Sequence, residues 1–131
     1  MERREINPWA WSVEMGFQQA VEVSGSQRTL YCSGQTSVDE SGTPLHANDM
    51  QGQMDQALDN LEAVLQGAGM ALSNVVRLNM YTTDVDAFMG GLESFGPRLA
   101  KAGLKNCSTL LGVQRLAFPE LMIELEATAV D

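Results

Sequence analysis

The sequence has little of the chemistry that holds metals or cross-links chains. It contains one histidine, His46, and two cysteines, Cys32 and Cys107. A structural zinc site needs about four clustered Cys, His or acidic ligands, so we expect no metal site. Two cysteines are too few for a disulfide framework, and we therefore expect free thiols in a reducing, cytoplasmic setting.

Positive charge is scarce as well. Lys and Arg number 8 against 17 Asp and Glu, which gives a formal net charge of −9 at pH 7. A surface this acidic repels phosphate backbones and anionic lipid, which argues against nucleic acid and membranes as partners. The apolar runs are only a few residues long, too short to span a bilayer. The opening stretch MERREINPWAW also lacks the apolar core of a signal peptide.

The remaining composition is that of an ordinary globular protein. Hydrophobic residues make up 44% and charged residues 19% of the 131 residues. A chain of this length buries a sizeable core, so we expect one domain over residues 1–131. Residues 1–12 are predicted to be irregular, with Trp9 and Trp11 covering an edge of the core.

The clearest element is a helix that begins after Asn48, the expected N-cap, and ends near Gly67 and Gly69. Its apolar residues recur at steps of three and four and form one stripe. A second helix is predicted from Asp84 to Gly103. Gly90, Gly91 and Pro97 interrupt its pattern, so we expect a kink there.

Strands are predicted on either side of these helices. Residues 17–23 and 28–34 are expected to form a hairpin around Gly25 and Ser26, followed by a turn at residues 41–44. Further strands are expected at residues 74–83, 108–113 and 121–130. The order of elements predicts an α+β fold in which a mixed sheet carries two helices on one face.

The last strand indicates what happens to the other face of this sheet. Leu121, Ile123, Leu125 and Ala127 alternate with a second row that contains Met122, Glu124, Glu126, Thr128 and Val130. Helices cover only the first row, so the second row must face solvent or a further subunit. We expect an oligomer, and we expect Glu126 to pair with Arg77 across the sheet.

Three segments resemble the RidA (YjgF-like) family of reactive intermediate deaminases. They are GFQQAVEV, LYCSGQTSVDESG and STLLGVQRLAFPELMIELEATAV, and with the central helix and strand the resemblance covers Val13 to Val130. It implies a chorismate-mutase-like α+β sandwich that forms a homotrimer, with small-molecule clefts between subunits. It also implies hydrolysis of amino-acid-derived enamines and imines to ammonia and a 2-oxo acid, without a metal or organic cofactor.

The resemblance assigns roles to particular residues. Glu124 matches the family's catalytic glutamate, and Phe17 replaces its cleft tyrosine. The position of the arginine that clamps the substrate carboxylate falls on Ser108, or on Cys107 or Asn106 if the alignment is shifted, and none of these is cationic.

The other candidate ligand-binding residues surround these positions. Thr109 supplies a hydroxyl, and Ser33 and Gln35 are expected at the rim of the cleft. Arg115 either replaces the missing clamp or is an ordinary arginine of a surface loop. Glu124, likewise, is either a general base or a solvated glutamate on a strand face.

Two functions therefore compete. The first is a metal-independent hydrolase or imine deaminase whose substrate preference is altered because the clamp arginine is replaced. The second is a non-catalytic ligand-binding or regulatory trimer that retains the cleft. A ribonuclease or translation-inhibitor activity, also attributed to members of this endoribonuclease L-PSP-like family, conflicts with the acidic charge and with the absence of a basic groove.

Overall fold

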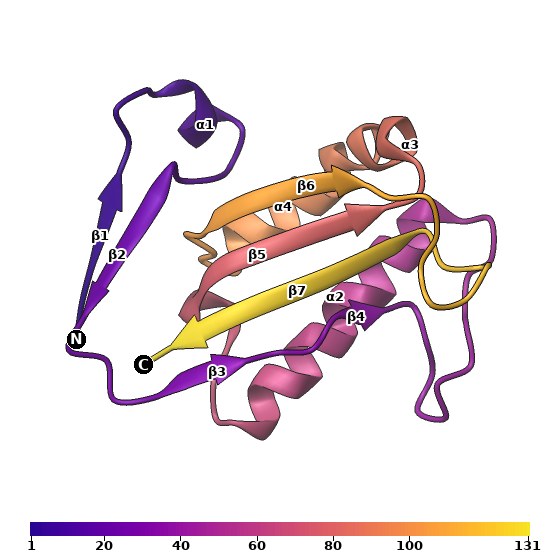
Figure 1. The fold of residues 1–131 in the computed structure, drawn as a ribbon, viewed down its shortest axis with the longest axis horizontal. Helices are drawn as coiled ribbons and strands as arrows, with labels where there is room; N and C mark the ends of the chain where they lie inside the picture. The colour runs from indigo at the N-terminus through magenta and orange to yellow at the C-terminus, as the bar shows by residue number, and fades with distance from the viewer.

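A computed structural model describes residues 1–131 and has the predicted α+β architecture (Figure 1). The elements are β1 (Glu2–Ile6), α1 (Trp11–Glu14), β2 (Ala20–Ser24), β3 (Thr29–Tyr31), β4 (Gln35–Thr36), α2 (Met50–Gly67), a 3-10 turn (Leu72–Asn74), β5 (Val75–Thr82), α3 (Val85–Gly90), α4 (Leu92–Lys101), β6 (Cys107–Gly112) and β7 (Ile123–Val130).

The main sheet is mixed and has β7 near its centre. Its strand order is β3-β7-β5-β6, and β4 also pairs with β7. Strands β5 and β6 are parallel, whereas every strand that pairs with β7 is antiparallel to it. Parallel neighbours need a long crossover connection, and α3 and α4 provide it between β5 and β6.

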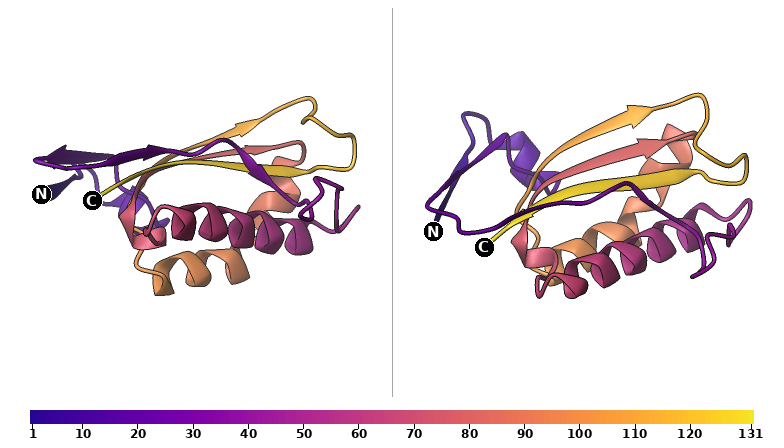
Figure 2. Two further views of the ribbon diagram at one scale, coloured as in Figure 1. Left: turned by 90° about the horizontal axis from the view of Figure 1, so that it is seen from below. Right: turned by 60° about the horizontal axis from the view of Figure 1, so that its bottom comes forward.

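Helices α2, α3 and α4 all lie on one face of this sheet, as the edge-on view shows (Figure 2). The apolar stripe of α2 packs against the buried row of β7, where Ile123, Leu125 and Ala127 are at most 2% exposed. The predicted alternation along β7 is therefore confirmed up to Ala127. Val130 departs from it, because it is buried at the end of the strand.

Both predicted helices form, with differences at their ends. The N-cap of α2 is Asp49, whose Oδ1 accepts a hydrogen bond of 3.0 Å from the Gly52 N–H. Asn48 instead takes a positive φ of 60° in the turn before it. The predicted kink is confirmed as a break at Gly91, which separates α3 from α4. A side chain at Gly91 would collide with the Met54 sulfur of α2, at 2.7 Å.

The prediction for the N-terminal region was wrong. Residues 1–12 are not all irregular, because β1 pairs with β2 in a separate antiparallel ribbon. The expected hairpin between β2 and β3 does not form, since β3 pairs with β7 instead. The ribbon pairs five residues of each strand, from Glu2 opposite Ser24 to Ile6 opposite Ala20, with one exposed ion pair between Arg4 and Glu22 at 3.0 Å. The polar strand β1 has no apolar alternation that would reveal it in the sequence. Trp9 and Trp11 are 60% and 52% exposed and do not cover the core.

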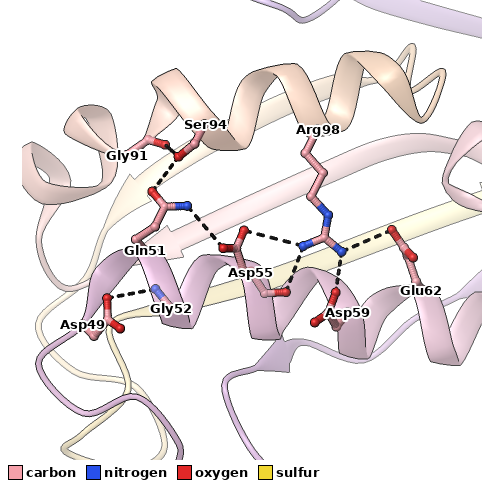
Figure 3. A network of polar contacts seen from close by, with 9 residues as sticks. All are labelled: Asp49, Gln51, Gly52, Asp55, Asp59, Glu62, Gly91, Ser94 and Arg98. Atoms are coloured by element: carbon pink, nitrogen blue, oxygen red, sulfur yellow. Dashed lines mark hydrogen bonds and ion pairs between the residues drawn. The ribbon is translucent and has the colours of Figure 1, made fainter.

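A charged network fixes α4 against α2 (Figure 3). The Arg98 guanidinium contacts three carboxylates of α2, those of Asp55, Asp59 and Glu62, and also donates to the Asp55 carbonyl oxygen at 3.2 Å. The side chain of Arg98 is only 30% exposed, so these interactions are less screened by water than ordinary surface pairs. The network sets the rotation of α4 about its axis.

We expect Arg98→Met to lower the free energy of unfolding by about 1.5–3 kcal/mol, because three carboxylates on one helix face lose their only shared cation. Denaturant unfolding measures this change. The matched control is Arg4→Met, which removes one exposed ion pair and should cost less than about 1 kcal/mol. Equal losses in the two variants would contradict this role for the network.

Candidate functional site

The helix-free face of the main sheet carries a polar row at its centre. In the pairing of β5 with β7, Tyr81 lies opposite Glu124 and Asn79 lies opposite Glu126. Because side chains alternate along a strand, both glutamates project to the same face, about 7 Å apart along the strand. Two carboxyl groups are therefore held side by side on a rigid element.

Glu126 is held in its ionised form. Its Oε1 accepts hydrogen bonds from Asn79 Nδ2 at 3.1 Å and from Tyr81 Oη at 2.9 Å. These bonds, together with the charge of Arg77, lower the pKa of Glu126. The hydrogen bond from Tyr81 to Glu126 also raises the pKa of Tyr81. The predicted ion pair between Glu126 and Arg77 does not form, because Asn79 and Tyr81 occupy the carboxylate.

Glu124 has the opposite environment. Burial, and then repulsion from Glu126, raise the pKa of Glu124, and the structure gives its carboxyl no hydrogen-bond donor. The backbone at Gly34 passes so close that a side chain there would collide with the Glu124 carboxyl. Neighbouring carboxyls with opposed pKa shifts are typical of acid–base sites, since one stays ionised while the other exchanges a proton.

Arg77 adds a cation to the same face, and the sequence interpretation did not recognise it as a site residue. Its Nη2 donates to Thr109 Oγ1 at 2.7 Å, and its Nη1 lies 3.5 Å from Cys107 Sγ. No carboxylate lies within ion-pair distance of it. The predicted residues Cys107 and Thr109 are thus on the face of Glu124, next to an arginine. The two-residue spacing of Arg77, Asn79 and Tyr81, which puts all three on one face of a strand, was the available signal in the sequence.

Phe17 and Ser108 lie on the other face of the sheet. Ser108 Oγ donates to the Leu78 carbonyl oxygen at 2.7 Å, and both residues line a cavity beneath α3 and α4. Neighbouring residues of a strand point to opposite faces, so Ser108 cannot accompany Cys107 and Thr109. Within one chain, the structure therefore does not bring Ser108 or Phe17 together with Glu124.

The remaining predicted residues lie at the periphery. Strand β4 pairs with β7 beside Glu124, and Gln35 Nε2 donates to the carbonyl oxygen of exposed Ser33 at 3.2 Å. Arg115 is exposed in the loop between β6 and β7, without an ion-pair partner. Lys105, two residues before β6, is an exposed cation whose Nζ lies 3.6 Å from the Glu5 carboxylate.

Neither a metal cluster nor a disulfide is present. No three His, Cys, Asp or Glu side chains lie close enough together to hold a metal ion, and both cysteines are free. None of the helices combines the length and the apolar character needed to cross a membrane.

Comparison with known proteins identifies the family. Residues 10–131 match the sequence pattern of the endoribonuclease L-PSP family. The chain belongs to this family, which includes the RidA and YjgF proteins. The solved structure of the Rid family protein YyfB from Yersinia pestis is 37% identical and superposes with a TM-score of 0.87 over 99% of each chain.

Other L-PSP family relatives are more distant. The RutC family protein of Aquifex aeolicus is 30% identical over 128 residues, which is 97% of this chain and 98% of its own. The mouse 2-iminobutanoate/2-iminopropanoate deaminase is 36% identical over 72 residues, 55% of this chain and 51% of the mouse protein. The predicted family and fold are thereby confirmed.

The raised pKa of Glu124 predicts a pH-dependent stability. A carboxyl whose pKa is raised in the folded state contributes its full stability at pH values below its ordinary pKa of 4.5. This contribution is lost as the pH rises through the pKa of the folded state. Glu124→Gln cannot ionise, so we expect it to unfold at a higher temperature than wild type at pH 7, with the difference disappearing under acid conditions. Thermal unfolding across pH measures this, with Glu120→Gln on the exposed loop as the control. A Glu124→Gln protein that is less stable at pH 7 would exclude the assigned environment.

Proposed function

We propose that this protein hydrolyses small imines or enamines and that Glu124 is its catalytic residue. The observation that carries the proposal is the pair of neighbouring carboxyls with opposed pKa shifts on the helix-free face. A carboxyl with a raised pKa can take a proton from water and return it later at a pH where an ordinary glutamate cannot. The similarity to a 2-iminobutanoate/2-iminopropanoate deaminase supports the same reaction class.

In the proposed reaction Glu124 acts first as a general base and then as a general acid. In the first step, the Glu124 carboxylate accepts a proton from water as the water oxygen bonds to the carbon of a protonated C=N group. In the second step, the protonated Glu124 gives its proton to the nitrogen of this carbinolamine. The C–N bond then breaks with its electron pair on nitrogen, the hydroxyl oxygen forms C=O, and its proton passes to the departing ammonia, which leaves as ammonium. Neither step needs an electron donor or acceptor.

Arg77 is the residue that we assign to an anionic group of the substrate. Its guanidinium contacts Thr109 of β6, which is paired with Asn79 and is therefore offset from Tyr81 by two residues, about 7 Å, along the strand direction. Glu124 lies on the opposite side of β5, on β7, so a substrate would span β5 between the two. A guanidinium binds a carboxylate with two parallel hydrogen bonds. The guanidinium lies beside Cys107, where residues 106–108 supply no cation, but it comes from β5 instead of β6, and on this different origin we base the altered substrate preference.

The helix-free face is also the surface that we propose buries itself in a homotrimer, with the ligand cleft between subunits. Tyr31 and Leu111 lie on this face and are 80% and 50% exposed, which is unusual for large apolar side chains. Two free thiols favour a reducing, cytoplasmic location for the assembly.

Substitution on this face tests the trimer. We expect Leu111→Lys to convert trimers to monomers, because a charge would be buried between subunits. Light scattering coupled to size-exclusion chromatography measures the mass. Val85→Lys, at an exposed apolar residue of α3, is the control and should remain trimeric. A monomeric wild type would overturn the proposed assembly.

For activity, we expect Glu124→Gln to lower kcat for imine hydrolysis by about 10²–10⁴-fold, the usual contribution of a general base. We expect Arg77→Gln to raise KM for a carboxylate-bearing imine at least about tenfold, the loss of one charge-assisted interaction. It should have little effect on the corresponding amide. Ammonia and 2-oxo acid release from freshly generated imines gives both constants.

Arg115→Gln is the matched control for Arg77, because Arg115 is also an arginine without an acidic partner but lies in an exposed loop. It should leave kcat and KM unchanged. Wild-type rates equal to the spontaneous background would overturn the deaminase. They would favour the second candidate, a non-catalytic ligand-binding trimer. The absence of a cation at residues 106–108 supports that candidate.

A further inference from the structure

Glu126 differs from Glu124 in that it keeps its negative charge throughout the proposed hydrolysis. The reaction begins from a protonated C=N group, whose positive charge none of the residues assigned so far binds. Glu124 takes up and releases a proton, so its charge changes during each cycle. The two hydrogen bonds to Glu126, together with the charge of Arg77, lower the pKa of its carboxyl and keep it ionised.

The hydrogen bonds to Glu126 occupy only one of its two oxygens. Asn79 and Tyr81 both donate to Oε1, at 3.1 and 2.9 Å, which leaves Oε2 to a further donor. The Glu126 side chain is half-buried on the helix-free face, so a small molecule on that face can reach it. A carboxylate accepts hydrogen bonds and donates none, and the matching ligand group is therefore a cation that carries N–H donors.

Asn79 shows that this orientation of the carboxylate has a cost. Its Nδ2 donates to Glu126, whereas its Oδ1 is buried and has no hydrogen-bond partner. A buried acceptor without a donor carries a desolvation penalty of about 1–3 kcal/mol. Unsatisfied groups of this kind are rare in native proteins and often mark functional sites. Holding Glu126 in place thus takes precedence over satisfying Asn79.

Arg77 and Glu126 lie on opposite sides of Asn79. Thr109, which the Arg77 guanidinium contacts, is paired with Asn79, and Asn79 is in turn paired with Glu126. The backbones of Thr109 and Glu126 are therefore two strand spacings apart, about 9.5 Å, at one level of the sheet. Glu124 follows at about 7 Å along β7. A small molecule with a carboxylate at Arg77 and a positive nitrogen at Glu126 lies next to Glu124 in this arrangement.

We propose that Glu126 is a specificity-determining residue that binds the protonated nitrogen of the substrate, and that Asn79 and Tyr81 hold its carboxylate in position for this contact. The inference rests on the imine hydrolysis proposed above. An opposite charge beside the nitrogen stabilises the protonated form of the imine, which is the form that the first step needs. A neutral ketone or amide gains less from this charge, so the site selects substrates by the charge on nitrogen.

Acetamidine and acetamide are matched probes, because both are planar and of equal size but only acetamidine is a cation at pH 7. We expect NMR titration of wild type to give at least about tenfold tighter binding of acetamidine. Glu126→Gln keeps the shape of the side chain and loses its charge, so it should abolish this preference. Glu120→Gln removes the same charge from the exposed loop and should retain it. Glu124→Gln should also retain it, since Glu126 is unchanged.

Kinetics separate this role from that of the general base. Glu126→Gln should raise KM for a freshly generated imine at least about tenfold while kcat changes less, because a binding contact is lost. In Glu124→Gln the loss should fall mainly on kcat. Release of ammonia and 2-oxo acid measures both constants.

Two results would overturn the assignment to Glu126. One is a preference for acetamidine that survives in Glu126→Gln, and the other is wild type without this preference; either result leaves the deaminase standing if imines are hydrolysed. A preference that disappears in Glu126→Gln, in a protein that hydrolyses no imine, would support the cation contact and overturn the deaminase alone. If Glu126→Gln does not fold, wild type decides, because acetamidine should shift the NMR resonance of the Glu126 side-chain carboxyl carbon and acetamide should not. Equal shifts would contradict the proposal.

Discussion

The structure depends on the packing of one strand, β7, whose two faces have different surroundings. Strand β7 has neighbours on both edges, α2 beneath it and no helix above it. Ile123, Leu125 and Ala127 provide the apolar surface on which α2 packs, and this packing fixes the strand in place. The intervening glutamates are then presented on the opposite face by a backbone that cannot move independently of the core.

This rigidity gives the two carboxyls their different chemistry. Asn79 and Tyr81 come from β5 at the register that delivers both to Glu126, so that one carboxylate is satisfied and the other is not. A one-residue slip of β5 would turn these side chains into the core. The acid–base properties of the site are therefore set by strand register rather than by a loop.

Sequence patterns predicted the elements whose burial is periodic. The stripe of α2, the alternation of β7 and the break at Gly91 all follow from spacing, because one side of each element must enter the core. Strand β1 was missed because Glu2–Ile6 is held by backbone pairing with β2 and by Arg3, which donates to the Ser73 and Val75 carbonyl oxygens. Local sequence cannot show such a distant partner.

The candidate site was predicted in part for a similar reason. Alternation placed Glu124 and Arg77 on the helix-free face, yet the partner of Arg77 depends on which residues of β6 lie beside it. A shift in register between Val75 and Arg77 further changes which residues of β5 are buried. Ser108 was assigned to the site by alignment, and alignment locates a residue along a strand without settling the face to which its side chain points.

The central position of β7 has a consequence for how the protein is made. It is the last strand along the chain, yet β3, β4 and β5 all pair with it. During synthesis the ribosome releases the other strands first, so β3, β4 and one edge of β5 wait with unpaired backbone groups until the final residues emerge. Open strand edges of this kind promote association between chains. The nascent protein is thus most in need of a chaperone just before its sheet can close.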